Sequence, residues 1–167
     1  SRLKAKDGVF SIMGNHDYCM YNRHSSQTAR MKAIAEVKAR ERRYGWQLLL
    51  NEHKVVHRGG DSIAIIGVEN SSRPPFPDYG NLAGAMECAE GQLPEFKVLL
   101  SHDPTHWRRE VLKKTDIQLQ LSGHTHATQF RLFGWSPASF VYDEYAGLYE
   151  EQNGVTEAAN EKKQKSD

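Results

Sequence analysis

The chain has 167 residues, of which 26% are charged and 38% are hydrophobic, so it is long enough to bury a core as one domain. Lysine and arginine total 22 against 21 aspartates and glutamates, and a net charge of +1 provides no global field that would attract nucleic acid or anionic lipid. We therefore expect a soluble chain with no nucleic-acid partner, and no apolar run approaches the roughly 20 residues that a membrane-spanning helix needs.

The first predicted strand covers residues 9–13 and runs into a polar loop. Its apolar run, Val-Phe-Ser-Ile-Met, stops at Gly14, and Asn15, His16 and Asp17 follow directly. A strand that ends in such a group of polar residues is typical of a functional loop.

Residues 27–44 predict one helix, because they contain no Gly or Pro and are rich in Ala, Lys, Arg and Glu. Between Arg30 and Arg43 this helix carries six basic residues and two acidic ones, so a surface for an acidic partner or for lipid headgroups is one interpretation. A solvated face stabilised by its own charge pairs is the commoner use of such a sequence, and we favour it.

The next segment predicts a hairpin, an irregular loop and a short helix. Residues 54–58 and 62–68 are expected to be strands, joined by the turn signal Gly-Gly-Asp at 59–61. Residues 71–80 contain three prolines, which predicts a loop, and residues 82–90 are expected to form the helix behind it.

A strand, helix and strand follow. Residues 96–101 predict a buried strand that ends before Pro104, residues 107–114 predict a helix, and residues 117–122 predict a second buried strand. Polar residues follow both strands, and this layout is typical of an α/β active site.

Four of the eight histidines directly follow predicted strands: His16, His102, His124 and His126. Residues two apart in an extended segment point the same way, so His124 and His126 can aim both imidazoles into one space. We expect Gly123 to remove a side chain where the backbone must come close. The remaining four are interpreted as ordinary polar residues: His24, His53, His57 and His106.

These side chains suit a pair of divalent metal ions. Imidazole, amide and carboxylate groups bind Zn²⁺, Mn²⁺ and Fe²⁺, and two such ions about 3.5–4 Å apart can polarise a phosphoryl group and lower the pKa of bound water. His124 and His126 can each serve a different ion, and Asn15 offers a neutral carbonyl oxygen. His16 is a candidate to protonate a leaving oxygen.

Three segments together resemble the last three motifs of calcineurin-like metallophosphoesterases: residues 13–17 (Met-Gly-Asn-His-Asp), 100–104 (Leu-Ser-His-Asp-Pro) and 121–126 (Leu-Ser-Gly-His-Thr-His). The resemblance runs from Gly8 to Tyr149 and looks closest to a bacterial branch whose members often carry membrane-spanning helices ahead of the catalytic domain. It implies an α/β fold, here a partial four-layer α/β/β/α sandwich with the metals at the carboxyl ends of the central strands.

The resemblance also implies roles for single residues. Four would be metal ligands, the first three for one ion and the last for the other: Asn15, His102, His124 and His126. His16 would be the leaving-group acid and a phosphate contact, and Asp17 would orient His16. The implied function is a metal-dependent phosphoric ester hydrolase of the phosphodiesterase or phosphatase type, with two Mn, Zn or Fe ions in the intact domain.

The chain departs from the family pattern in its carboxylates. The family's Asp-x-His and Gly-Asp-x-x-Asp motifs, which include the aspartate that bridges the two ions, are not among these residues. We therefore expect residues 1–149 to be a truncated catalytic domain that holds at most one ion and is nearly inactive alone, followed by a polar, disordered tail at 150–167. The alternative is a non-catalytic metal-binding or partner-binding module. Membrane association through an upstream segment and a homo-oligomer formed by domain exchange are left open.

Overall fold

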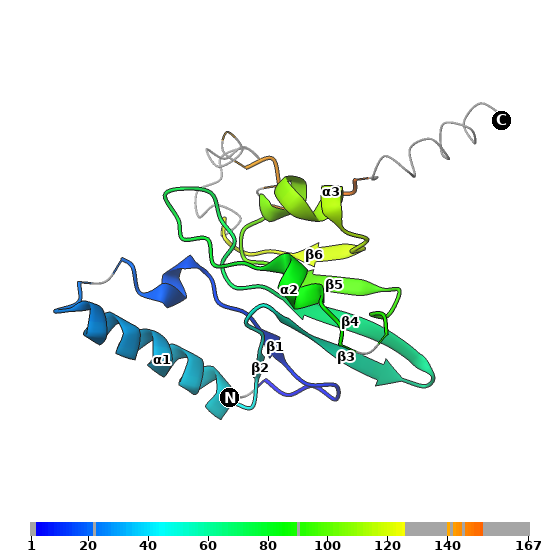
Figure 1. Ribbon diagram of the computed structural model, residues 1–167, viewed down its shortest axis with the longest axis horizontal. Coiled ribbons are helices and arrows are strands. Elements are labelled where there is room, and N and C mark those ends of the chain that lie inside the picture. The colour runs from blue at the N-terminus through cyan, green and yellow to red at the C-terminus, as the bar shows by residue number, and fades with distance from the viewer. Residues whose placement is uncertain are drawn as a thin grey trace.

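A computed structural model describes residues 3–21, 23–89, 91–125, 140, 142–144 and 146–151 (Figure 1). Two sheets organise them. The smaller sheet pairs β1 (Phe10–Ser11) in parallel with β2 (Gln47–Leu48). The larger sheet has the order β3-β4-β5-β6, with strands β3 (Glu52–Arg58), β4 (Asp61–Gly67), β5 (Lys97–Leu100) and β6 (Leu119–Leu121).

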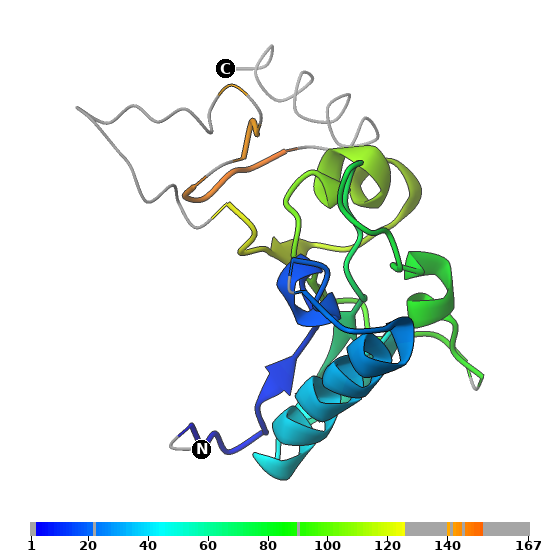
Figure 2. The same cartoon turned by 90° about the vertical axis from the view of Figure 1, so that its left-hand side faces the viewer.

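The register of the larger sheet explains how strand ends meet. The β3–β4 pair is an antiparallel hairpin, whereas β4, β5 and β6 are parallel neighbours. The carboxyl ends of these three strands therefore lie at one edge of the sheet. Figure 2 shows η1 (Asn15–Tyr18), drawn in dark blue, next to that edge.

Helices cover the larger sheet on one face (Figure 1). These are α2 (Leu82–Met86) and the continuous pair η2 (Trp107–Val111) and α3 (Leu112–Lys114). They share one buried cluster with the strands: Ala64, Ile66, Val68, Leu82, Ala85, Leu99, Val111 and Ile117. This cluster is the main core, and it holds β4 and β5 in place.

A second core lies under α1 (Gln27–Arg43), which packs against β2 and η1. Its buried members are Met13, Tyr18, Cys19, Ile34 and Leu48. Gly67 of β4 lies against residues that follow β1 and β2, and an added Cβ there would lie 2.3 Å from Cβ of Leu49 and 3.0 Å from a methyl group of Ile12. Glycine is needed there because the smaller sheet packs directly on the backbone of β4.

Most expected elements are confirmed, and the α/β class with them; the mixed sheets and helices agree with the sandwich that the resemblance implies. The helix expected at 27–44 ends at Arg43, with Tyr44 as its C-cap. Two short elements were not expected, the η1 turn and β2, and α2 ends at Met86, not at residue 90.

Two expectations about the chain's ends stay predictions. The boundary between residues 149 and 150 is not tested by the fold, and residues 152–167 of the expected tail lie outside the described residues. None of the helices in the described part of the chain has the length and hydrophobicity of a membrane-spanning segment.

Candidate metal centre

Three of the expected metal ligands lie at the ends of three strands. Asn15 begins η1 after β1, His102 follows β5, and His124 follows β6. The backbone N–H groups of Gly123 and His124 donate to the carbonyl oxygen of His102 at 3.1 and 3.0 Å, so the two loops are fixed to each other. The structure thus brings together Asn15, His102 and His124 from distant parts of the sequence.

The three side chains meet through one ring nitrogen of His102. Its Nε2 atom lies 2.9 Å from Oδ1 of Asn15 and 3.1 Å from Nδ1 of His124. A protonated Nε2 has one hydrogen for two acceptors, Oδ1 and an unprotonated Nδ1, and an unprotonated Nε2 faces Oδ1 with lone pair against lone pair. One N–H of His102 can serve both contacts only as a shared and therefore weaker hydrogen bond. Three lone-pair donors that converge in this way suit a cation.

The spacing of these atoms also fits a metal ion. Ligand atoms bound about 2.0–2.1 Å from a divalent ion lie about 2.9–3.4 Å from each other, for angles between octahedral and tetrahedral. The two observed distances, 2.9 and 3.1 Å, fall in this range. Within the described ranges no three His, Cys, Asp or Glu side chains form such a group, so the amide of Asn15 is needed as the third donor. All three donors are neutral.

Two tyrosines orient the donors from outside. The Tyr21 hydroxyl accepts a hydrogen bond from Nδ2 of Asn15 at 2.9 Å, which turns Oδ1 of the amide toward His102. The Tyr142 hydroxyl lies 3.0 Å from Nε2 of His124. If Nε2–H donates to this hydroxyl, Nδ1 keeps its lone pair for the centre, and such outer partners commonly fix the tautomer of metal-binding histidines.

The surroundings of Tyr142 bring charged groups close to the centre. Burial raises the pKa of Tyr142, the charges of Asp103 and Tyr21 raise it further, and Arg73 lowers it. Because the net effect is a raised pKa, the hydroxyl stays protonated at neutral pH. The ring of Phe76 packs edge-on against His124, with centroids 4.9 Å apart.

Gly14 explains how the Asn15 loop can approach His102 so closely. A Cβ at Gly14 would lie 2.8 Å from three atoms of the His102 ring, and its φ of −96° is one that any residue adopts. Glycine is therefore required by the close approach and not by its backbone angle. The expectation for Gly123 finds no support among the described residues, since none of their atoms lies within 4 Å of an added Cβ there.

His16 and Asp17 lie beside the three donors. The exposed ring of His16 packs on the ring of Tyr21 with centroids 4.6 Å apart. The Asp17 carboxylate accepts the backbone N–H of Gly14 at 2.9 Å and closes the η1 turn. In the part of the chain that the structure describes, Asp17 makes no hydrogen bond to His16, so its orienting role stays a prediction. His126, the expected ligand of a second ion, lies outside the described residues.

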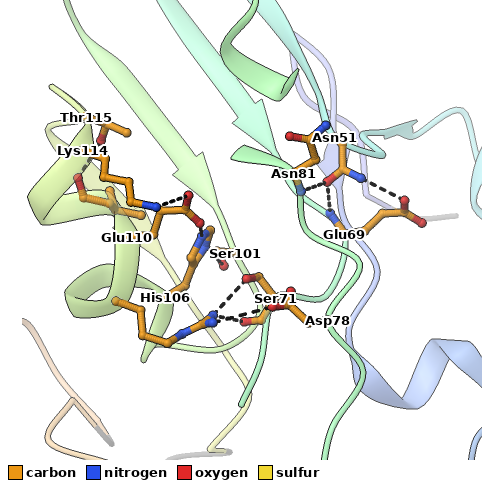
Figure 3. A network of polar contacts seen from close by, with 12 residues as sticks. Asn51, Glu69, Ser71, Asp78, Asn81, Ser101, His106, Glu110, Lys114 and Thr115 are labelled. Atoms are coloured by element: carbon orange, nitrogen blue, oxygen red, sulfur yellow. Dashed lines mark hydrogen bonds and ion pairs between the residues drawn. The ribbon is translucent and has the colours of Figure 1, made fainter. Parts of the chain in front are cut away.

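A second histidine network lies behind the centre and was not expected. His106 is 1% exposed; its Nδ1 lies 2.9 Å from the Ser101 hydroxyl and its Nε2 lies 3.2 Å from the Glu110 carboxylate (Figure 3). Burial lowers the pKa of His106, and Arg109 lowers it further against the raising effect of Glu110. A neutral ring that accepts from Ser101 and donates to Glu110 satisfies every contact.

The η1 loop is tied to the larger sheet through Glu69, which follows β4. Its carboxylate accepts the Tyr18 hydroxyl at 2.9 Å and Nδ2 of Asn51 at 3.0 Å. Asn51 in turn accepts the backbone N–H groups of Glu69 and Asn81 (Figure 3). This network, which nothing in the sequence pattern indicated, sets the position of Asn15 relative to the sheet.

A model of the calcineurin-like phosphoesterase family matches residues 1–128 of the chain. A transmembrane protein with metallophosphoesterase domain from Bos taurus is 25% identical over 151 residues, which cover 89% of this chain and 32% of that protein. The uncharacterized metallophosphoesterase YkoQ of Bacillus subtilis is 27% identical over 130 residues, 77% of this chain and 41% of YkoQ.

A further uncharacterized metallophosphoesterase of Bacillus subtilis, YkuE, is 29% identical over 160 residues, which cover 93% of this chain and 48% of YkuE. The chain therefore spans less than half of the length of each of these curated relatives. They come from a vertebrate and a bacterium, so similarity alone does not place the chain in the bacterial branch. No solved structure matches the chain significantly.

Proposed function

Because the chain belongs to the calcineurin-like phosphoesterase family, we propose that it is the metal-binding part of a metal-dependent phosphoric ester hydrolase. The observation that carries the proposal is the convergence of Asn15 Oδ1 and His124 Nδ1 on Nε2 of His102, at distances that also fit the ligands of one metal ion. The phosphodiesterase or phosphatase type, and Mn, Zn or Fe as the metal, are part of the proposal.

The residues divide into those that hold metal and those that act on the substrate. Asn15, His102 and His124 hold one ion, and His126 serves a second ion. Bound ions of this kind polarise a phosphoryl group and lower the pKa of a coordinated water. The chain's own contribution is to fix the donors, through the Tyr21 hydroxyl on Asn15 and the backbone hydrogen bonds to His102.

His16 is the proton donor to the leaving oxygen and a contact of the phosphate in this proposal. Its exposed ring can reach a substrate, and the packing of Tyr21 on one side holds it next to Asn15. Asp17 supports it indirectly, because its carboxylate closes the turn that carries both Asn15 and His16.

Charge limits what these 167 residues do alone. Asn15, His102, His124 and His126 are neutral, so they do not offset the repulsion between two divalent ions a few ångströms apart. We expect at most one ion in this chain and little activity, and higher activity in a version extended upstream by the family's two carboxylate-bearing motifs. The neutral donor set also favours a second candidate function, a non-catalytic metal-binding or partner-binding module.

Hydrolysis of bis-(p-nitrophenyl) phosphate with added Mn²⁺ distinguishes the two candidates. In the extended version we expect turnover that falls in His16→Ala, with metal content unchanged, because His16 donates a proton and binds no metal. His57→Ala is the matched control, since His57 is exposed on β3 and pairs with Ser62 near the start of β4, at the other end of that strand from the metal centre. A folded, metal-loaded protein with no turnover supports the module, whereas turnover that does not depend on His16 keeps the hydrolase and contradicts the role given to His16.

Two further properties belong to the proposal. The name of the Bos taurus relative supports membrane association of the intact protein through a segment outside these residues. Among described strands none pairs with the outer edge of β6, which supports domain exchange between copies. Membrane fractionation of the intact protein tests the first, and light scattering tests the second.

A further inference from the structure

A proline-rich loop forms one wall of the metal centre. It follows Asn70 and runs from Ser71 to Gly80, and within it the backbone N–H of Phe76 donates to the carbonyl oxygen of Arg73 at 3.1 Å. This bond closes a turn that places Phe76 against the ring of His124. Arg73 is therefore presented on the same turn that touches a candidate ligand.

The base of this loop is clamped by buried hydrogen bonds. Nδ2 of the buried Asn70 donates to the carbonyl oxygen of Pro77 at 2.6 Å, and the backbone N–H of Tyr79 donates back to Asn70 at 2.7 Å. Arg109 of η2 donates to the hydroxyl and the carbonyl oxygen of Ser71, at 2.9 and 3.1 Å. The loop is thus a fixed support for its tip.

The Arg73 side chain is exposed and, within the described part of the chain, takes part in no ion pair or hydrogen bond. Its position relative to the centre is set by the backbone: the Arg73 carbonyl oxygen accepts from Phe76, whose ring packs against His124 with centroids 4.9 Å apart. The carboxylates nearby are already engaged. Asp78 pairs with Arg109 at 3.7 Å, and Asp103 is 1% exposed and accepts the backbone N–H of Thr105.

We propose that Arg73 binds the phosphoryl oxygens of the substrate at this centre, from the fixed turn that packs against His124. The inference deepens the proposed function and rests on it for the identity of the substrate. A guanidinium forms two parallel hydrogen bonds to a phosphate and keeps its charge at every physiological pH, so it suits an oxyanion beside neutral metal ligands.

The test is direct binding of radiolabelled inorganic phosphate in equilibrium dialysis, with and without Mn²⁺, for the wild type, Arg73→Gln and Arg73→Lys. Arg40→Gln is the matched control, because Arg40 is an exposed arginine on α1. We expect Arg73→Gln to weaken phosphate binding at least about tenfold. Arg73→Lys should recover part of the loss, and Arg40→Gln should stay within about twofold of the wild type at moderate salt. Bound Mn²⁺ should be equal in all four proteins.

Several outcomes overturn the inference: no phosphate binding by the wild type, Arg73→Gln that binds as the wild type does, or an equal loss in Arg40→Gln. The inference and the proposed function can fail separately. Phosphate binding that depends on Arg73 in a protein that takes up no metal supports the anion site and removes the hydrolase. Metal-dependent turnover in a protein whose phosphate binding is unchanged by Arg73→Gln supports the hydrolase and removes the anion site.

Discussion

Two histidine clusters lie on either side of the end of β5, and they differ in how their ring nitrogens are used. His106 has one partner for each nitrogen, Ser101 at 2.9 Å and Glu110 at 3.2 Å, and one neutral tautomer satisfies both. His102 has two partners on a single nitrogen, so one hydrogen would have to be shared between them. The first arrangement stabilises a fold, and the second suits a bound cation.

Burial alone would have selected the wrong cluster. His106 is 1% exposed and has a lowered pKa, features that often mark functional groups, yet its contacts are complete. Glu110 shows the same pattern: its own burial would raise the pKa, but hydrogen bonds from His106 and Lys114 outweigh burial and lower it. The convergence of several donor atoms on one ring nitrogen is the better guide to a ligand site in this molecule.

The largest expected effect separates the clusters by metal content. His102→Ala should reduce metal affinity by at least about 100-fold, because it removes the shared ligand and even outer partners of metal sites contribute 10–100-fold. His124→Ala should act alike, and metal in the wild-type chain should already be below one ion per chain. Competition titration with a chelating dye measures this, with His57→Ala as control. Two tightly held ions per chain would contradict the argument.

A substitution in the other cluster, at His106, should affect the stability of the fold. His106→Ala removes a buried ring and leaves the Ser101 hydroxyl without its partner, which should lower the free energy of unfolding by about 2–4 kcal/mol. Its effect on metal affinity, measured per folded molecule, should be small. Urea unfolding of His106→Ala and His102→Ala side by side tests the contrast, and equal destabilisation by both would remove it.

The sequence predicted the strand ends well because strands and motif residues are local features. The expected strands and helices were found near their expected bounds, and His102 and His124 follow β5 and β6 as expected. The partners of the donors could not be predicted. Tyr142 follows His124 by 18 residues and no periodicity links them, while the Asn51–Glu69 network depends on contacts between distant loops.

His106 is a residue whose structural role the sequence did not predict. It was interpreted as an ordinary polar residue because no pattern distinguished it, and it is in fact a buried part of the scaffold. Gly14 likewise looked like the end of a strand, although its reason is the ring of His102 against its backbone. Both facts concern packing across long sequence separations, which local patterns do not encode.

A pH dependence of stability should sharpen the comparison. Because the pKa of His106 is lowered in the folded state, the unfolded chain takes up a proton that the folded chain does not. The contribution of His106 is present above its unfolded pKa and is lost as the pH falls toward its folded pKa. We expect stability to fall by up to about 1.4 kcal/mol per pH unit from this group. Urea unfolding at about pH 7.5 and about pH 5.5 should show a smaller change in His106→Gln; equal changes would contradict the assignment.

The smallest expected effect tests how the donors are oriented. Tyr21→Phe removes only the hydroxyl that accepts from Nδ2 of Asn15, and it keeps the ring that packs on His16. Tyr21 is 53% exposed, so water can replace the hydroxyl and stability should change by less than about 0.5 kcal/mol. The amide then loses the contact that keeps Oδ1 toward His102, and metal affinity should fall by up to about tenfold.

Tyr44→Phe is the control for this last change, because Tyr44 is 45% exposed and caps α1 away from the strand ends. Loss of affinity in Tyr21→Phe alone, with unfolding unchanged, means that the hydroxyl positions the amide donor. If Asn15→Ala lowers metal affinity and Tyr21→Phe does not, then Asn15 is a ligand whose orientation Tyr21 does not set. If neither change has an effect, the amide is not part of the centre, and the two histidines alone would be too few ligands to hold an ion.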